Sequence, residues 1–241
     1  MDEIKKMMRF DYVNCIGIGG KYAYIFCAVI FAACLLGAYP AAVGFMVAPL
    51  ALFSPIEAVR KGDFMKIYGL LPVKRESVIK ALFAEILIPQ TIGGILGELC
   101  LLISRAVGES GILPPFIQEH TYDSVTANTE NTGLNYSNWF VLLAAGLAMI
   151  TAIICLFYAI KEIKGDTVAI IACIPFLVIM CALMIVYFIT LDYGILPLPQ
   201  EFLPTNPVLV VLIVAACFAA FTAFGWLMCR LTVKLTADKE M

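Results

Sequence analysis

The sequence predicts an all-α integral membrane protein with six transmembrane helices, and two observations carry this prediction. Hydrophobic residue types make up 62% of the 241 residues and charged types only 14%, whereas soluble domains have about 45–50% and about 25%. A chain of this size cannot hide that excess in one soluble core, because its surface must stay polar. The composition excludes an ordinary cytosolic enzyme, a nucleic-acid-binding protein and a disordered chain.

The second observation is that the apolar residues gather in six runs. A helix that crosses a bilayer needs about 20 residues and satisfies its own backbone hydrogen bonds. The predicted spans cover residues 22–38, 41–58, 78–107, 138–160, 167–191 and 206–231. Only Tyr39 and Pro40 separate the first two spans, which predicts a tight helical hairpin. Prolines within the spans predict kinks or breaks, at Pro49, Pro55, Pro89 and Pro175.

The placement of charge predicts the orientation. With the N-terminus in the cytoplasm, 15 of the 16 Lys and Arg residues fall on the inner side, and only Arg105 falls outside. Cytoplasmic loops of membrane proteins are enriched in Lys and Arg. Both termini are therefore predicted to be cytoplasmic, which agrees with an even number of spans. The predicted outer loop at 108–137 is polar and acidic, and it either caps an exit or is a plain external loop.

Residues 2–14 precede the first span and show a different pattern. Apolar residues recur at helical spacing and basic residues lie opposite, with Ile4, Met7, Met8 and Tyr12 on one side and Lys5, Lys6 and Arg9 on the other. This pattern predicts an amphipathic helix on the inner membrane surface, with its apolar side in lipid and its basic side toward the headgroups. Two roles stay open, a plain anchor or an elbow that also contacts a cytoplasmic partner.

The cytoplasmic segment 59–77, between the second and third predicted spans, mixes positive charge with apolar side chains. The stretch from Arg60 to Lys80 holds six basic residues, and the apolar residues among them are Phe64, Met65, Ile67, Tyr68, Leu70 and Leu71. Exposed aromatic and aliphatic residues in a charged loop are typical of a protein docking surface. The alternative is a loop that lies on lipid headgroups.

The third span carries a stripe of small and polar residues. Helical spacing places four of them on one face, Gln90, Gly94, Gly97 and Glu98. Gly93 and Gly97 also form a Gly-x-x-x-Gly pattern, which permits close helix contact. An ionised Glu98 facing lipid would cost about 2.5 kcal/mol or more, so the stripe is expected to face packed protein, a dimer seam or a translocation path. Arg105 lies two turns farther on, in reach of a pair with Glu98.

The chain shows no constellation typical of catalysis or metal binding. The glycine-rich stretch at 17–22 lacks the leading glycine and the final Ser or Thr of a phosphate-binding loop. His120 is the single histidine, and no Cys-x-x-Cys pair occurs among the nine cysteines. All nine fall in spans or on the inner side, where cysteines behave as small buried hydrophobes. We therefore expect no catalytic residue, no metal and no cofactor bound by this chain.

Residues 70–81 read Leu-Leu-Pro-Val-Lys-Arg-Glu-Ser-Val-Ile-Lys-Ala. This segment resembles the Leu-Pro-Val-(Ser)-Arg-x-x-(Ile/Val)-Val-x-x-Lys signature of ATP-binding-cassette type-2 permeases, in their small six-span subgroup. That family carries the signature between its second and third spans, after a cytoplasmic amphipathic helix, and has both termini inside. The similarity covers the whole chain in layout and about a dozen residues in motif. Lys74 stands where the family often has Ser.

The resemblance implies a single permease domain, 1–241, in a bacterial plasma membrane. In this family two permease copies pair with two copies of a separate cytoplasmic ATPase, which binds ATP and Mg. A coupling helix around residues 63–70 would seat in that ATPase, and the residues implied in coupling are Asp63, Phe64, Met65, Tyr68, Leu71, Pro72 and Arg75. The subgroup includes exporters of phenol-soluble-modulin-type toxins and lantibiotics, so the implied cargo is an amphipathic or hydrophobic peptide.

Two other functions stay open. One is an ion-coupled secondary transporter that uses Glu85 and Glu98 as proton or cation sites, although the sequence lacks the repeated broken spans frequent in that class. The other is a membrane scaffold or immunity protein, which would confer tolerance to a peptide without moving it.

Overall fold

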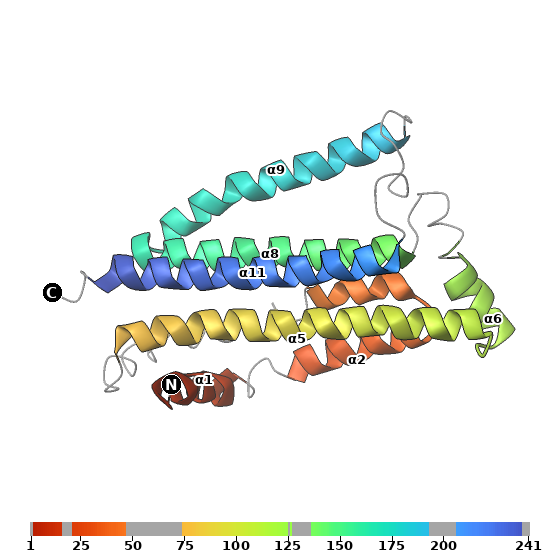
Figure 1. Ribbon diagram of the computed structural model, residues 1–241, viewed down its shortest axis with the longest axis horizontal. Helices are drawn as coiled ribbons and strands as arrows, with labels where there is room; N and C mark the ends of the chain where they lie inside the picture. Colours follow the sequence, from red (N-terminus) through yellow and green to blue (C-terminus); the bar gives the residue numbers. More distant parts are fainter. Residues whose placement is uncertain are drawn as a thin grey trace.

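The computed structural model describes residues 2–15, 21–46, 74–124, 126, 136–192 and 206–237. Within these ranges all regular secondary structure is helical, as the sequence predicts, and the helices form an elongated bundle (Figure 1). Three described helices are long and apolar enough to cross a membrane. They are α5 (Arg75–Ser110), α8 (Tyr136–Lys164) and α11 (Pro207–Thr236). The count of six spans and the cytoplasmic termini stay predictions.

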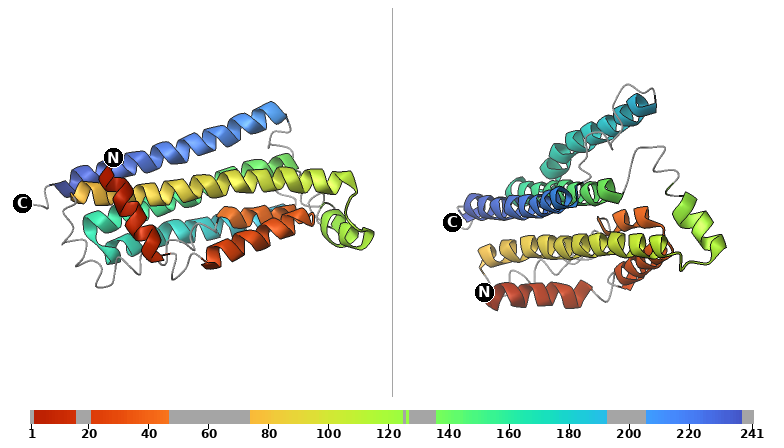
Figure 2. Two further views of the ribbon diagram at one scale, coloured as in Figure 1. Left: turned by 90° about the horizontal axis from the view of Figure 1, so that it is seen from below. Right: turned by 45° about the vertical axis from the view of Figure 1, so that its right-hand side comes forward.

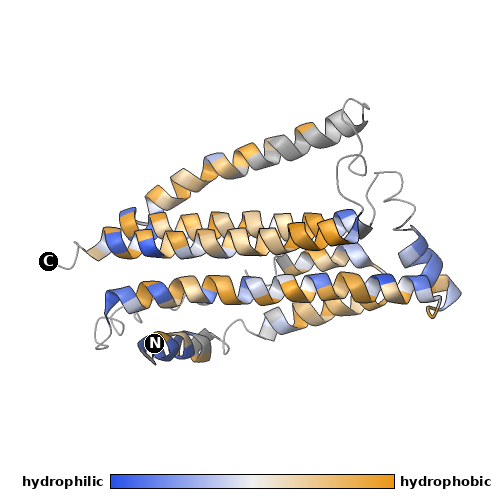
Figure 3. Cartoon of the chain, in the orientation of Figure 1, coloured by the Kyte–Doolittle hydropathy of each residue, from blue (hydrophilic) through white to orange (hydrophobic). Residues whose placement is uncertain are grey.

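Helices α5, α8 and α11 pack against one another and form the centre of the bundle. Both ends of the chain lie at the same end of the molecule, where α5 starts and α8 ends (Figure 1). Apolar residues dominate the middle of α8 and α11, whereas α5 carries hydrophilic residues along its length (Figure 3). Helix α5 is thus the long helix that brings polar groups into the bundle.

Helix α9 (Asp166–Asp192) follows α8 through a one-residue turn. Gly165 makes this turn with a positive φ of 95°, a conformation that side chains with a Cβ rarely adopt. Lys161 pairs with Asp166 across the turn at 3.2 Å. Helix α9 then leans away from the bundle toward its far end (Figure 1). It passes through Pro175 as one helix, so of the kink or break predicted there, the break does not occur.

The predicted first hairpin is formed by α2 (Lys21–Leu35) and the 3-10 helix η2 (Tyr39–Met46). Gly37, with a φ of 91°, lies in the turn between them, and the two arms pack against each other. The second arm was predicted to be an α-helix from Ala41 onward, but its described part is the tighter 3-10 form. Residues 47–58, with Pro49 and Pro55, lie outside the described residues.

Helix α1 (Asp2–Cys15) is the predicted amphipathic helix, and it crosses the bundle obliquely at the end where the chain begins (Figure 2). It packs against the first turns of α5, and Ser77 Oγ donates a hydrogen bond to Glu3 Oε2 at 2.9 Å. The side chain of Met7 is only 2% exposed. The expectation that this side of the helix lies in lipid is therefore wrong for Met7, which packs against protein.

Helix α5 is longer than the predicted span 78–107. It begins at Arg75, so the last three residues of the predicted loop 59–77 belong to its first turn. It also passes through Pro89 without a break. Proline is tolerated in membrane helices where neighbouring groups satisfy the freed backbone. Pro89 has no amide N–H and cannot donate the usual helical hydrogen bond to the carbonyl oxygen four residues earlier. The nearby bond from Thr91 Oγ1 to the Leu87 carbonyl oxygen, at 2.7 Å, is a separate contact within the helix.

The predicted outer loop 108–137 is partly helical. It holds the short helix α6 (Pro115–Gln118) and the π-helical turn η3 (Glu119–Asp123). The Thr121 hydroxyl lies within hydrogen-bond distance of the carbonyl oxygens of Ile117 and Leu36, at 2.6 and 2.5 Å. This segment therefore lies folded against the turn after α2.

Candidate functional site

The stripe predicted on the third span lies on α5 and faces the inside of the bundle. Gln90 is 0% exposed, and Gly94 and Gly97 are buried. Glu98 is partly exposed as a residue, but both of its carboxyl oxygens are buried. The stripe therefore faces protein rather than lipid, as the cost of exposing Glu98 to lipid requires.

Helices of the same chain fill the space next to the two glycines. A Cβ added at Gly94 would lie 2.3 Å from Leu147 Cδ2 on α8 and 2.7 Å from Phe218 Cζ on α11. A Cβ at Gly97 would lie 2.9 Å from Leu143 Cδ2. The missing side chains thus let α8 and α11 approach α5 closely. A seam with a second copy would have to use another face of α5.

Three polar side chains of this face are buried without a hydrogen-bond partner among the described residues. They are Gln90, with both amide atoms, Glu98, with both carboxyl oxygens, and Ser104, with its hydroxyl. Native proteins satisfy about 90% or more of such groups, and each exception costs about 1–3 kcal/mol. Sequence reasoning missed Ser104, although its 14-residue spacing from Gln90 places it on the same face.

The two carboxyl groups considered for ion coupling lie far apart. Glu85 is buried like the stripe residues, but it precedes Glu98 by 13 residues, or about 20 Å along a helix. Arg105, which the sequence places in reach of Glu98, donates from Nε to Glu109 Oε1 at 2.8 Å, and neither carboxyl oxygen of Glu98 has a hydrogen-bond partner in the described structure. An acidic residue one turn away competes better for Arg105 than one two turns away.

An aromatic cluster of Tyr39, Tyr122 and Trp139 lies near the C-terminal end of α5. The Tyr39 ring meets the rings of Tyr122 and Trp139 edge to face, with centroids 6.4 and 6.0 Å apart. The Tyr122 ring also lies directly on Gly108, where an added Cβ would be 2.1 Å from Tyr122 Cε2. The three rings thus pack together beside the last turns of α5.

The residues expected to couple to an ATPase lie mostly outside the described residues, namely Asp63, Phe64, Met65, Tyr68, Leu71 and Pro72. Arg75 is described and half-buried in the first turn of α5. The basic residues of α1 that are expected to anchor it at the membrane surface are exposed, at Lys5, Lys6 and Arg9. Helix α1 and the start of α5, at Arg75, lie at the same end of the bundle (Figure 1).

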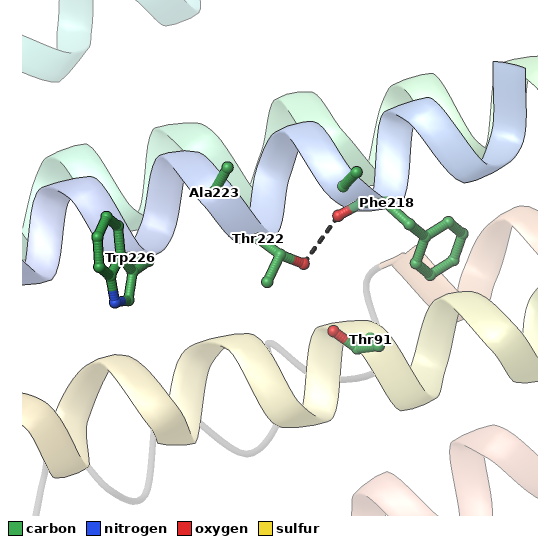
Figure 4. A pocket seen from close by; sticks show the side chains of 6 residues that line it. Thr91, Phe218, Thr222, Ala223 and Trp226 are labelled. Carbon is green, nitrogen blue, oxygen red and sulfur yellow. Dashed lines mark hydrogen bonds between the residues drawn. The ribbon is translucent and has the colours of Figure 1, made fainter.

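A groove of about 540 Å³ lies between α5 and α11 (Figure 4), and Thr222 and Trp226 in its wall are exposed. It is lined by Thr91, Phe218, Ala219, Thr222, Ala223 and Trp226. Thr222 Oγ1 donates to the Phe218 carbonyl oxygen at 2.8 Å, so this hydroxyl is satisfied within its own helix. The walls are therefore apolar in character, and nothing in the sequence pattern marked them.

No protein-family model, curated protein or solved structure matches the chain. Within the described ranges, no cluster of three or more His, Cys, Asp or Glu side chains is placed to hold a metal ion. Seven cysteines in the described part of the chain are free thiols and form no disulfide, namely Cys27, Cys34, Cys100, Cys155, Cys173, Cys217 and Cys229.

Proposed function

We propose that this chain is the permease subunit of an ATP-driven exporter and works with a separate cytoplasmic ATPase. One observation carries the proposal. The second half of the signature-like segment 70–81 forms the first turns of α5, and α5 also carries the buried polar stripe. A force applied at the segment before α5 therefore acts on the helix that holds the candidate path.

The geometry supports α5 as a lever. Its 36 residues form one continuous helix, about 54 Å long at 1.5 Å per residue. Helix α1 packs on its inner end, with the hydrogen bond from Ser77 to Glu3 between them. Closure of an ATPase dimer on residues 63–70 would then move α1 and α5 together as a rigid body. Movement of α5 against α8 and α11 would open or close the stripe.

The other parts of the proposal rest on the family resemblance. They are two ATPase copies that bind ATP and Mg, a second copy of this chain, and six spans in a bacterial plasma membrane. The proposed cargo is an amphipathic or hydrophobic peptide. A peptide with one polar side suits a bundle whose inward face holds Gln90, Glu98 and Ser104 among apolar residues.

Uptake by inside-out membrane vesicles tests this proposal. We expect a fluorescently labelled amphipathic helical peptide to accumulate when ATP is added and to be unaffected by a protonophore. The double variant Phe64→Ala/Tyr68→Ala should abolish uptake, because it removes apolar contacts with the ATPase. A matched control is Ile112→Ala, which removes a 79% exposed side chain at the opposite end. Full uptake by the double variant would refute the proposal.

An ion-coupled transporter is the second candidate, and the two buried carboxyl oxygens of Glu98 favour it. An ionised carboxylate in such a place is costly unless a proton or a cation accompanies it. Glu85 would have to act as a separate site because of its distance. Uptake that continues without ATP, collapses with the protonophore and is lost in Glu98→Gln would establish this alternative.

A further inference from the structure

We propose that the groove between α5 and α11 binds one acyl chain of an anionic phospholipid, whose phosphate pairs with Arg230. The inference rests on the proposed membrane location but not on the proposed transport activity. The groove adjoins the polar stripe, because Phe218 lines it and also lies next to Gly94, and its exposed wall on α11 is formed by Ala219, Thr222, Ala223 and Trp226.

The length of the groove fits one acyl chain in one leaflet. The lining residues of α11 run from Phe218 to Trp226, a rise of about 12 Å. Half of a hydrocarbon core of about 30 Å is about 15 Å. Ala219 and Ala223 line the groove on α11, and their side chains are small. The groove also runs along the helices, as an acyl chain in a bilayer does.

The end of the groove near the C-terminus of α11 carries the charge for a headgroup. The Arg230 guanidinium lies over the Trp226 ring, with its Cζ 4.3 Å from the ring centroid. In the part of the chain that the structure describes, Arg230 has no ion pair with an acidic side chain. Tryptophan is enriched at the membrane interface, and the arginine fork matches phosphate oxygens. The predicted orientation places this end in the cytoplasmic leaflet.

Charge also decides against a second copy of this chain as the occupant. A two-fold contact brings the same surface of both copies together. Helix α11 carries Arg230 and Lys234 near this end and has no acidic residue between Pro207 and Thr236. Pairing the two α11 faces would set like charges beside each other, whereas an anionic headgroup neutralises them.

Quenching of Trp226 by brominated lipids tests the inference. The chain has two tryptophans, so Trp139→Phe leaves Trp226, which is 56% exposed, as the single reporter. This variant is reconstituted in phosphatidylcholine with a small fraction of phosphatidylglycerol, and one lipid at a time carries bromine on its acyl chains. We expect brominated phosphatidylglycerol to quench Trp226 about fivefold more per mole than brominated phosphatidylcholine does. This factor corresponds to the attraction of about 1 kcal/mol between one basic residue and anionic lipid.

Two further variants, both in the Trp139→Phe background, sharpen the test. Arg230→Gln should bring the two lipids to equal quenching, whereas Lys164→Gln, which removes an exposed charge at the end of α8, should preserve the preference. Ala223→Phe should fill the groove and lower quenching by both lipids.

Each contrary result has a distinct meaning. Equal quenching in the Trp139→Phe protein would overturn the inference, since only unselective boundary lipid would touch Trp226. If the protein floats with the vesicles but neither lipid quenches Trp226, the inference is overturned, and a second copy of the chain covers the groove instead of lipid. A protein that does not float would refute the membrane location instead.

Discussion

Gly94 provides the sharpest structural prediction, because two helices converge on it. The substitution Gly94→Val places a Cβ where Leu147 Cδ2 would be 2.3 Å away and Phe218 Cζ 2.7 Å away. These two tips can move aside for one methyl group, but valine adds two more carbons on a branched, rigid side chain. Overpacking of this kind costs about 1–3 kcal/mol.

For a chain of this size, 1 kcal/mol corresponds to about 2–4 °C in Tm. We therefore expect Gly94→Val to lower Tm by about 2–12 °C. The chain suits a thermal assay with a thiol-reactive dye in mild detergent, because Cys34, Cys100, Cys155 and Cys173 are free and buried. These thiols react when the bundle opens.

The control adds the same bulk to a free face of the same helix. Ala106→Val changes an exposed residue of α5 and should leave Tm nearly unchanged. In the Gly94→Val background, Leu147→Ala should cost less than it does alone, with a coupling of about 0.5–3 kcal/mol typical of residues in contact. An unchanged Tm for Gly94→Val, or strict additivity with Leu147→Ala, would refute this packing of α5 against α8.

Three further predictions concern other parts of the bundle. Glu98→Gln should leave Tm unchanged or slightly raised, because the Glu98 carboxyl oxygens make no hydrogen bond in the described structure. The variant should also abolish any labelling of residue 98 by a hydrophobic carbodiimide, read by mass spectrometry. A large drop in Tm would contradict the absence of hydrogen bonds to Glu98. Tyr122→Ala removes a half-buried ring that packs on Gly108 and should cost about 1–3 kcal/mol of stability, below the value for a fully buried aromatic residue. It should also speed proteolysis of residues 111–124. Unchanged cleavage would show that the Tyr122 ring does not hold this segment against α5. Met7→Ala should cost about 2 kcal/mol or more and expose α1 to protease, whereas Lys5→Ala should change neither.

The apolar runs predicted the central helices well, because length and hydrophobicity alone mark α5, α8 and α11. The exact ends were missed for local reasons. Arg75 was placed in a loop because the segment before it is charged, yet it continues the turn that begins α5. Pro89 was expected to kink or break the helix, and α5 continues through it without a break. The 3-10 form of Tyr39–Met46 depends on packing against α2 and α5, which no local pattern shows.

The candidate site was only partly predictable. The stripe of Gln90 and Glu98 follows from helical spacing and from the cost of polar groups in lipid. The sequence also allowed a pair of Arg105 with Glu98, but Arg105 pairs with Glu109, which lies closer along the same helix, and the Glu98 oxygens make no hydrogen bond in the described structure. The aromatic cluster on Gly108 and the α5–α11 groove are tertiary features, built from residues distant in the sequence. Single-sequence patterns carry no signal for such contacts.

The central claim is that the chain draws its energy from a partner ATPase. The most direct measurement is purification of the tagged chain in mild detergent, with ATPase activity assayed on the material that accompanies it. We expect a stoichiometric ATPase subunit, lost from the Phe64→Ala/Tyr68→Ala variant and retained with Ile112→Ala. A chain that purifies alone and still moves peptide would contradict the proposed function and would turn attention to Glu98.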